Sequence, residues 1–426
     1  SAAHLLGYLG EISGEELQKG LFPEARGGDF IGKSGVEKAF EKYLKGERGG
    51  RQVEVNATGQ VVRVLQTVPA TPGKNIFLTI DQELQRKAET LLEGLAGAAV
   101  AMEPSTGEVL AIASSPTFDQ NDFVSGLSNQ VWDEIRANPF RPLENKAIQG
   151  TYPPASTYKI ITAIAGLEEG IIDENTTFFC PGHYRLGNRT FRCWKRGGHG
   201  KVGVVDAIEK SCDVFFYQVG QKLGVDRLAW YAKACGLGAS AGIDIAHEAA
   251  GLVPTAEWKK QRTGVSWQAG ETLSVAIGQG YNLTTPLQML VLTAAVGNGG
   301  TRLRPLILKS LRNPDGETLY SSRPEEVGHL PVSPKTLDIV RRGLWKVVNQ
   351  KTGTAWVARV AGIDISGKTG TAQVFSRKKN ETLFSQDRPA FLNSHAWFVA
   401  YAPAENPRIA VAVLVEHGDH LSLIHI

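Results

Sequence analysis

Residues 150–161 read GTYPPASTYKII, and the rest of the chain is organised around them. Two prolines end an extended segment, and apolar residues at helical spacing follow through Leu167. This pattern predicts that Ser156 lies in the first turn of a largely buried helix, with Lys159 one turn further on. Residues three apart share a helix face, so the Lys159 amine can reach the Ser156 hydroxyl. The helix N-terminus adds positive potential where a transition-state oxyanion would form.

Two further motifs supply the partners that an acylating serine needs. A Ser-x-x-Lys tetrad alone is common in chains of this length and indicates no more than a serine at a helix start. Here Ser211-Cys212-Asp213 opens an apolar segment, and Lys368-Thr369-Gly370-Thr371 lies on a strand-like stretch. The order Ser-x-x-Lys, Ser-x-Asn or Asp, Lys-Thr-Gly is that of the penicillin-recognising serine acyltransferases.

Bulk composition bounds the class of protein. The 426 residues are 42% hydrophobic and 21% charged, which is typical of a globular chain with two domains. A net charge of +3 from 46 basic and 43 acidic residues is too balanced for a general nucleic-acid binder. No apolar run reaches the length of a membrane span, and the chain starts at Ser1 without an initiator methionine. We therefore expect a fragment whose membrane anchor lies upstream.

Apolar runs predict the architecture. Residues 98–102 and 109–113 are expected to form one hairpin, and residues 396–401 and 409–415 a second. Strands from both ends of the domain should share one sheet, with mostly helical patterns between them. The fold class is therefore α+β, an α/β sandwich whose large helical insert carries Ser156.

The first part of the chain has a different character. Residues 1–72 are rich in charge and glycine, have few large apolar side chains and should form a small elongated module. Thr71-Pro72-Gly73-Lys74 serves as a linker, and a compact core begins with a strand at residues 76–80 and a helix that starts at Asp81. The expected domains are residues 1–72 and 73–426.

Nearly the whole chain resembles the class B penicillin-binding proteins, in particular the elongation-type transpeptidases. Beyond the three motifs, the resemblance rests on the stretches at residues 4–10, 32–38, 54–56, 145–147, 278–280, 284–288 and 395–398. It implies a penicillin-binding transpeptidase fold with a central antiparallel sheet. It also implies that residues 1–72 are a non-catalytic, dimerisation-type pedestal.

The chemistry of acyl transfer assigns roles to the motif residues. A serine must lose its proton as it attacks, and a desolvated lysine near a second positive charge can accept that proton. Ser156 is then the nucleophile, Lys159 the base and Lys368 the candidate for the second charge. Ser211 can relay a proton to the leaving amine.

The strand motif is expected to bind the substrate. Thr369 and Thr371 offer hydroxyls for its terminal carboxylate, and Gly370 lies between them. By family geometry, the backbone amides of Ser156 and Thr371 would form the oxyanion hole.

Two positions depart from the commoner family pattern. Asp213 replaces an asparagine, although the elongation-type enzymes resemble this chain in carrying aspartate. An ionised carboxylate between two lysines favours their charged forms, so either Asp213 points at Lys368 and the substrate amide, or the resting protons are arranged differently. Ala155 stands where glycine usually precedes the nucleophile, and it restricts the start of the helix.

Cys180, Cys193, His199 and Cys212 are spaced as Cys-x12-Cys-x5-His-x12-Cys. Three thiolates and one imidazole make a complete tetrahedral zinc set, and a metal would order the polar, glycine-rich loop between them. A structural zinc ion is therefore expected, one that also holds Ser211 through Cys212. The alternative is a disulfide between Cys180 and Cys193, with the other two residues uninvolved. Cys235 is expected in the core.

The resemblance implies a peptidoglycan DD-transpeptidase of cell elongation that β-lactams acylate. It would act on the periplasmic side of the inner membrane with a membrane glycosyltransferase and elongation scaffold proteins, and without nucleic acid. A DD-carboxypeptidase or β-lactamase, or a non-catalytic penicillin-binding sensor, are the alternatives. The residues from Asp419 onward no longer resemble the family, which we interpret as truncation or a cloning scar.

Overall fold

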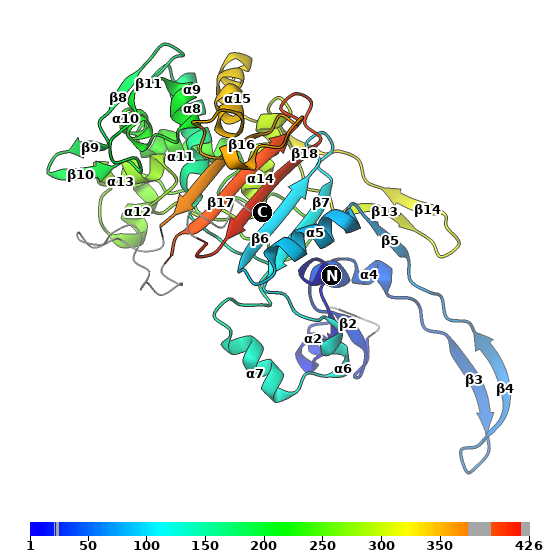
Figure 1. The fold of residues 1–426 in the computed structure, drawn as a ribbon. Coiled ribbons are helices and arrows are strands. Elements are labelled where there is room, and N and C mark those ends of the chain that lie inside the picture. Colours follow the sequence, from blue (N-terminus) through cyan, green and yellow to red (C-terminus); the bar gives the residue numbers. More distant parts are fainter. Residues whose placement is uncertain (21, 23–24, 374–392, 419–426) are drawn as a thin grey trace.

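The computed structural model describes residues 1–20, 22, 25–373 and 393–418, and Figure 1 shows its fold. The helices are α1 (Ala3–Leu6), α2 (Gly14–Gln18), α3 (Gly35–Ala39), α4 (Glu41–Leu44), α5 (Gln82–Leu92), α6 (Asn121–Ser125), α7 (Asn129–Ala137), η1 (Ala155–Tyr158), α8 (Lys159–Glu168), α9 (Val204–Glu209), α10 (Asp213–Leu223), α11 (Val225–Ala234), α12 (Ala256–Thr263), α13 (Ala269–Ala276), α14 (Pro286–Gly297), α15 (Pro334–Asn349) and η2 (Trp356–Ala358). The strands are β1 (Leu9–Glu11), β2 (Phe30–Gly32), β3 (Gly50–Val55), β4 (Val61–Val68), β5 (Asn75–Leu78), β6 (Gly97–Met102), β7 (Val109–Ser115), β8 (Phe178–Cys180), β9 (His183–Leu186), β10 (Arg189–Arg192), β11 (Gly200–Val202), β12 (Thr301–Leu303), β13 (Leu308–Arg312), β14 (Thr318–Ser321), β15 (Glu326–His329), β16 (Ser366–Ala372), β17 (His395–Ala402) and β18 (Ile409–Val415).

A five-stranded antiparallel sheet with the order β16-β17-β18-β6-β7 forms the centre of the molecule. The two predicted hairpins are present, and β18 pairs with β6, so strands from both ends of the domain share one sheet as expected. The predicted α+β class is confirmed. The motif strand β16 lies at one edge, where its outer side is available to the helical insert.

The alternation of side chains along these strands builds two cores. On one face, Ala99 and Val413 pack with Leu92 of α5. On the other face, Val100 and Leu414 belong to the main core that the helices of the insert share. Because successive strand residues point to opposite faces, both faces of the sheet are covered by helices.

The insert between β7 and β16 holds the nucleophile. Its helix α14 is buried along its whole length and begins with a capping box between Thr285 and Gln288, with Pro286 at the first helical position. Helix α8 is buried from Lys159 to Gly166. A helix that is apolar on all sides requires surrounding helices, so Ser156 is delivered from a rigid element.

The N-terminal segment extends away from the sheet as the β3–β4 hairpin (Figure 1). The amphipathic stretch at residues 36–44 does not form one helix, because the backbone leaves the helical region at Phe40 between α3 and α4. Leu5 and Val36 pack into the main core. Strand β5 pairs with β13 rather than with the central sheet.

In the described ranges, none of the helices combines the length and the hydropathy that a membrane crossing requires. The truncation or cloning scar predicted from Asp419 onward lies outside the described residues.

Candidate active site

The nucleophile motif begins with a short 3-10 turn. Ser156 lies in η1, which continues directly into α8, so the predicted helix start is observed. Ala155 has φ +50°, a left-handed conformation that L-residues seldom adopt and that glycine favours. The Ala155 N–H donates to the Gly278 carbonyl at 2.9 Å. The turn is thus held from outside the helix.

Lys159 is fully buried beneath this turn. Its Nζ donates to the Ser211 carbonyl at 2.9 Å, to Ser211 Oγ at 3.2 Å and to Asp213 Oδ1 at 2.6 Å. Among the described residues, no hydrogen bond joins Lys159 Nζ to Ser156 Oγ. The structure therefore shows a resting state in which the lysine is paired with the second motif.

Asp213 pairs with Lys159, and among the described residues it forms no ion pair with Lys368, so the structure favours the second of the two alternatives, a different arrangement of the resting protons. Its second oxygen, Oδ2, accepts the Trp194 backbone N–H at 2.9 Å. Burial raises the pKa of the Asp213 carboxyl, and the Lys159 charge opposes that rise. The reason is local: Asp213 opens α10, directly beside the buried face of α8.

The backbone of Ser211 has an unusual conformation, which brings this residue close to Lys159. Its φ is +51°, and the Cys212 N–H donates to the Ala207 carbonyl at 2.9 Å, which turns the chain sharply between α9 and α10. This turn aims both the carbonyl and the hydroxyl of Ser211 at one amine. Left-handed non-glycine residues concentrate at functional sites, where surrounding contacts stabilise them.

Strand β16 closes the other side. A Cβ added to Gly370 would lie 3.2 Å from the Pro154 carbonyl oxygen and 3.3 Å from Thr157 Cγ2, so the strand touches the nucleophile turn. Lys368 is fully buried, and its Nζ donates to the Thr369 carbonyl at 3.1 Å. Burial, followed by the charge of Lys159, holds the pKa of Lys368 well below its ordinary value, while Asp213 opposes the shift.

The structure thus brings the three motifs together, and it adds residues to which the sequence analysis assigned no role at the site. Thr354 Oγ1 lies 2.8 Å from Thr369 Oγ1, and Gln279 Nε2 donates to the Thr371 carbonyl at 3.1 Å. Gln279 belongs to a Gly-x-Gly stretch whose glycines could have indicated a tight turn. No sequence motif indicated Thr354, because a single threonine in a loop belongs to no recognisable motif.

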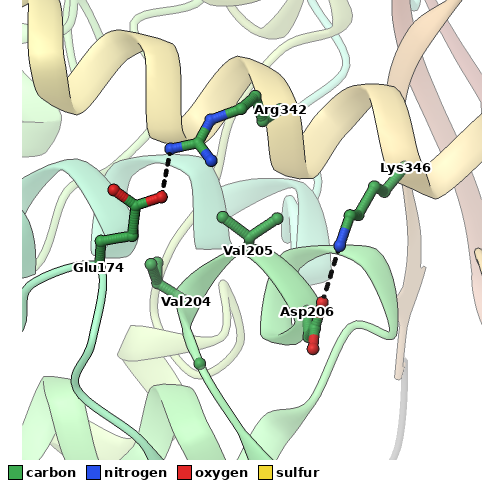
Figure 2. Close-up of a pocket in the computed structure, with 7 residues that line it drawn as sticks. Glu174, Val204, Val205, Asp206, Arg342 and Lys346 are labelled. Atoms are coloured by element: carbon green, nitrogen blue, oxygen red, sulfur yellow. Dashed lines mark hydrogen bonds and ion pairs between the residues drawn. The ribbon is translucent and has the colours of Figure 1, made fainter.

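A pocket of about 260 Å³, lined by both apolar and charged side chains, lies between α9 and α15, outside these motifs (Figure 2). Arg342 pairs with Glu174 at 2.7 Å, and Lys346 pairs with Asp206 at 3.0 Å across it. The Lys346–Asp206 pair connects α15 to α9, and α9 ends two residues before Ser211.

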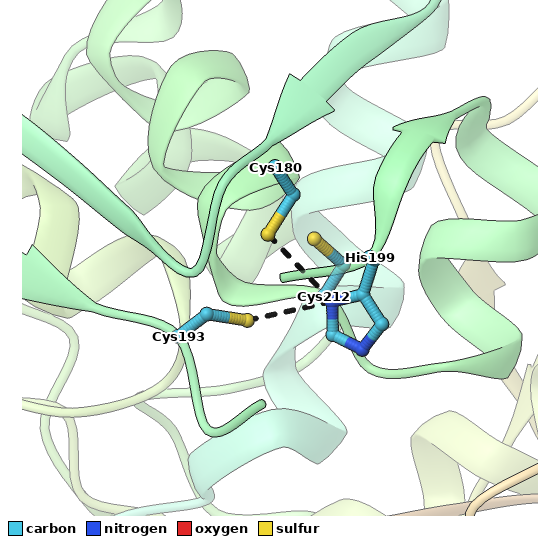
Figure 3. Close-up of side chains that lie close together, drawn as sticks. All are labelled: Cys180, Cys193, His199 and Cys212. Carbon is cyan, nitrogen blue, oxygen red and sulfur yellow. Dashed lines mark hydrogen bonds between the residues drawn. The ribbon is translucent and has the colours of Figure 1, made fainter. Parts of the chain in front are cut away.

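The four predicted ligands form one cluster (Figure 3). Their ligand atoms all lie within 4.8 Å of one another, with His199 Nδ1 3.5 Å from Cys193 Sγ and 3.7 Å from Cys180 Sγ. Tetrahedral zinc, with bonds of about 2.3 Å to sulfur and 2.0 Å to nitrogen, has edges of about 3.5 Å. All four cysteines of the chain are free, so the alternative disulfide is not formed. Cys235 lies apart in the core.

This cluster adjoins the catalytic motifs directly. Cys193 precedes Trp194, whose N–H holds Asp213, and Cys212 lies between Ser211 and Asp213. The cluster could hold a metal ion, and the geometry of the donors fits one.

Comparison with known proteins agrees with this geometry. The penicillin binding protein transpeptidase domain matches residues 97–423, which include all three motifs. The chain belongs to the penicillin-binding protein transpeptidase family. A second family model, the penicillin-binding protein dimerisation domain, matches residues 1–78 of the chain.

Relatives of this penicillin-binding protein include peptidoglycan D,D-transpeptidases MrdA. That of Haemophilus influenzae is 41% identical over 425 residues, which is 98% of this chain and 65% of the relative. That of Escherichia coli K12 is 39% identical over 422 residues, which is 97% of this chain and 66% of the relative. The chain therefore spans about two thirds of the length of these relatives.

Solved structures of penicillin-binding proteins show the same fold. PBP2 in its complex with MreC from Helicobacter pylori is 34% identical, with a TM-score of 0.85 over 100% of this chain and 76% of that one. Pseudomonas aeruginosa PBP2 in complex with WCK 5153 is 38% identical, with a TM-score of 0.81 over 99% of this chain and 86% of that one.

Proposed function

We propose that this protein is a peptidoglycan D,D-transpeptidase of cell elongation. Ser156 attacks the penultimate D-Ala carbonyl of a donor stem peptide, the terminal D-Ala leaves with a proton, and an acceptor amine resolves the acyl-enzyme. β-Lactams acylate Ser156 in the same way. The observation that carries the proposal is the set of three hydrogen bonds that joins Lys159 to Ser211 and Asp213 beneath the nucleophile turn.

The resting Lys159–Asp213 pair defines the proton path. Lys159 must release a proton before it can accept that of Ser156, and Asp213 lies 2.6 Å away with a carboxyl pKa raised by burial. Asp213 is therefore the acceptor in our scheme. Ser211 Oγ, 3.2 Å from Lys159 Nζ, then passes a proton to the leaving amine.

We assign the oxyanion hole to the backbone amides of Ser156 and Thr371. Gln279 reaches the Thr371 carbonyl, so this carbonyl points to the outer edge of β16. In an antiparallel strand the N–H and C=O of one residue point to the same side, so the Thr371 N–H points to this edge as well. We further propose that Thr369, Gly370 and Thr371 line the substrate site with Lys368.

Labelling with a fluorescent penicillin tests the acyl-transfer proposal. We expect a stable covalent adduct on the parent chain, a complete loss of label with Ser156→Ala, and normal labelling with the exposed control Ser105→Ala. Absence of an adduct on the parent would leave the non-catalytic sensor as the better interpretation. Rapid release of hydrolysed label would instead favour a carboxypeptidase or β-lactamase.

We also propose that Cys180, Cys193, His199 and Cys212 bind one structural zinc ion. The support is their mutual distances and the free state of the three thiols. Metal analysis should find about one zinc per chain, and a chelator should lower both the melting temperature and the rate of penicillin acylation.

Paired cysteine variants make this metal prediction specific. Cys193→Ser should lose the zinc and reproduce the effect of the chelator, because one of four ligands is removed. Cys235→Ala should retain the zinc, since this buried cysteine lies outside the cluster. A metal-free parent whose mass is reduced by two hydrogens would replace the zinc site with a disulfide.

The larger assembly follows from the relatives. We propose that residues 1–72 form the pedestal and residues 73–426 the catalytic domain, with an anchor segment upstream that holds the protein on the periplasmic side of the inner membrane. Scaffold and glycosyltransferase partners are supported by the PBP2–MreC complex and by a peptidoglycan synthase complex with a TM-score of 0.84 and 33% identity. Co-purification with both partners from membranes, by way of a tagged full-length chain, tests this arrangement.

A further inference from the structure

One face beside the catalytic motifs has an extreme charge. Residues 175–205 contain no aspartate or glutamate, although the chain as a whole has nearly equal numbers of acids and bases. The stretch instead carries basic side chains, all of them exposed: Arg185, Arg189, Arg192, Lys195, Arg196 and Lys201. These side chains, which we call the basic surface, account for more than the whole net charge of +3.

The charges of the basic surface are not neutralised within the protein. Across the described ranges, none of the six forms an ion pair with a carboxylate. In the β9–β10 hairpin, Arg185 and Arg192 lie on the same face in diagonal positions of the two strands. Long side chains in such positions can reach each other, so the two guanidinium charges repel.

The packing of this hairpin explains how it keeps its exposed charges in place. Tyr184, Leu186 and Phe191 alternate with the charged residues and pack against the main core. The hairpin lies at the outer margin of the helical insert (Figure 1). Arg185 and Arg192 therefore lie on the opposite face of the hairpin, whereas Arg189 lies on the apolar face, with its guanidinium over the Phe191 ring at 5.4 Å.

The basic surface begins at the catalytic centre. Lys195 and Arg196 directly follow Trp194, whose backbone N–H donates to Asp213 at 2.9 Å. The Arg192 carbonyl accepts the hydroxyl of Tyr217, on helix α10 that Asp213 opens, at 3.2 Å. The segment that carries Arg192, Lys195 and Arg196 is thus joined by hydrogen bonds to the second catalytic motif and to the helix that follows it.

We propose that the basic surface binds the carboxylates of an acidic peptide while that peptide occupies the active site. This inference rests on the proposed function, in which the substrate is a stem peptide with a carboxylate terminus and acidic groups. The contacts give orientation and a faster encounter, because exposed cations raise the local concentration of an anionic ligand. An adjoining peptide site favours an acidic peptide over nucleic acid, since the rest of the chain carries more acids than bases.

Peptide binding, measured in a Ser156→Ala background that cannot form the acyl-enzyme, tests the proposal without catalysis. The probe is a fluorescein-labelled pentapeptide that ends in D-Ala-D-Ala and contains glutamate, and its analogue has the glutamate amidated. Arg185→Gln/Arg192→Gln/Arg196→Gln should weaken binding of the acidic probe about tenfold at low salt. Binding of the amidated probe should change less than about twofold. Added salt should remove the difference between the parent and the triple variant.

A matched triple variant controls for total charge. Arg86→Gln/Lys87→Gln/Lys335→Gln removes three exposed, unpaired cations from α5 and the start of α15 and should leave the affinity unchanged. Penicillin labelling of the parent and both triples is measured in parallel, so a failure of the proposed function is recognised separately as absence of label. Equal loss with both triples, equal loss with both probes, or a preference for an oligonucleotide over the acidic probe overturns the proposal.

Discussion

At the scale of single residues, the decisive feature is a buried carboxylate with two different partners. Asp213 offers Oδ1 to the Lys159 ammonium and Oδ2 to the Trp194 N–H. An asparagine has only one acceptor oxygen, so its NH₂ group would face a donor on one side or the other. The two donors therefore require two acceptor oxygens, and this requirement explains the aspartate at position 213.

We predict that Asp213→Asn lowers the rate of penicillin acylation at least tenfold, by roughly the value of one general acid–base group. The free energy of unfolding should fall by about 1–3 kcal/mol, because a buried donor is left without its acceptor. Stopped-flow labelling and urea denaturation measure the two effects. Asp206→Asn, which breaks an exposed pair with Lys346, should change stability by no more than about 1 kcal/mol. An unchanged acylation rate in Asp213→Asn would remove the carboxylate from the proton path.

At the scale of elements, the position of Ser156 is set by neighbours and not by its own helix. The Gly278 loop accepts the Ala155 N–H, and Gly370 of β16 approaches from the other side. A Cβ on Gly278 would lie 2.1 Å from the Ala155 oxygen, closer than atoms can approach. A side chain at position 278 would therefore displace the nucleophile turn.

Two glycines of the same loop give a sharp comparison. Gly278 and Gly280 both have φ +72°, so alanine at either costs about 1 kcal/mol of backbone strain. Only Gly278→Ala collides with the nucleophile turn, since the nearest atom to a Cβ on Gly280 is Ser274 Cβ at 3.6 Å. We expect Gly278→Ala to lose about 100-fold or more in acylation rate. Gly280→Ala should acylate normally, and similar rates in the two variants would show that the turn does not depend on this contact.

At the scale of the whole molecule, the first residues of the chain are bonded to the segment that leads to the nucleophile. His4 Nε2 donates to the Pro142 carbonyl at 2.6 Å, and Asn145 Nδ2 donates to the His4 carbonyl at 3.4 Å. The His4 ring also packs edge-on against Phe118 at 5.1 Å. The junction between the N-terminal segment and the catalytic sheet thus depends on a neutral, buried imidazole.

Acid should weaken this junction. Burial lowers the pKa of His4 from 6.5 to about 4, so between these values the unfolded chain binds a proton that the folded chain does not. Stability must then fall as the pH falls through this window, by up to about 3 kcal/mol from this residue. Thermal melts of the parent and His4→Gln between pH 7 and pH 4 measure the difference. The variant, which can still donate to Pro142, should lose less stability on acidification, and parallel melting curves would contradict the assignment to His4.

Much of the fold could be predicted because the deciding patterns are local. The continuous apolar runs of β6, β7, β17 and β18 and the cap at Asp81 identified their elements directly. Residues 36–44 lie in two short helices and not in one, because the backbone leaves the helical region at Phe40, and amphipathic periodicity does not record such a break. The membership of β5 in a separate sheet with β13 depends on pairing across the chain, which no local pattern records.

The sequence by itself determined the three motifs, their order and the set of three cysteines and one histidine that could hold a metal, because residue type and spacing along the chain express this chemistry. Only the tertiary structure decided which lysine Asp213 pairs with, and that Trp194, Gln279 and Thr354 support the site. The physical reason is that these contacts join distant segments through backbone groups. A backbone amide or a left-handed turn such as that at Ser211 has no signature in the residue types, and it acquires its partner only when the chain is folded.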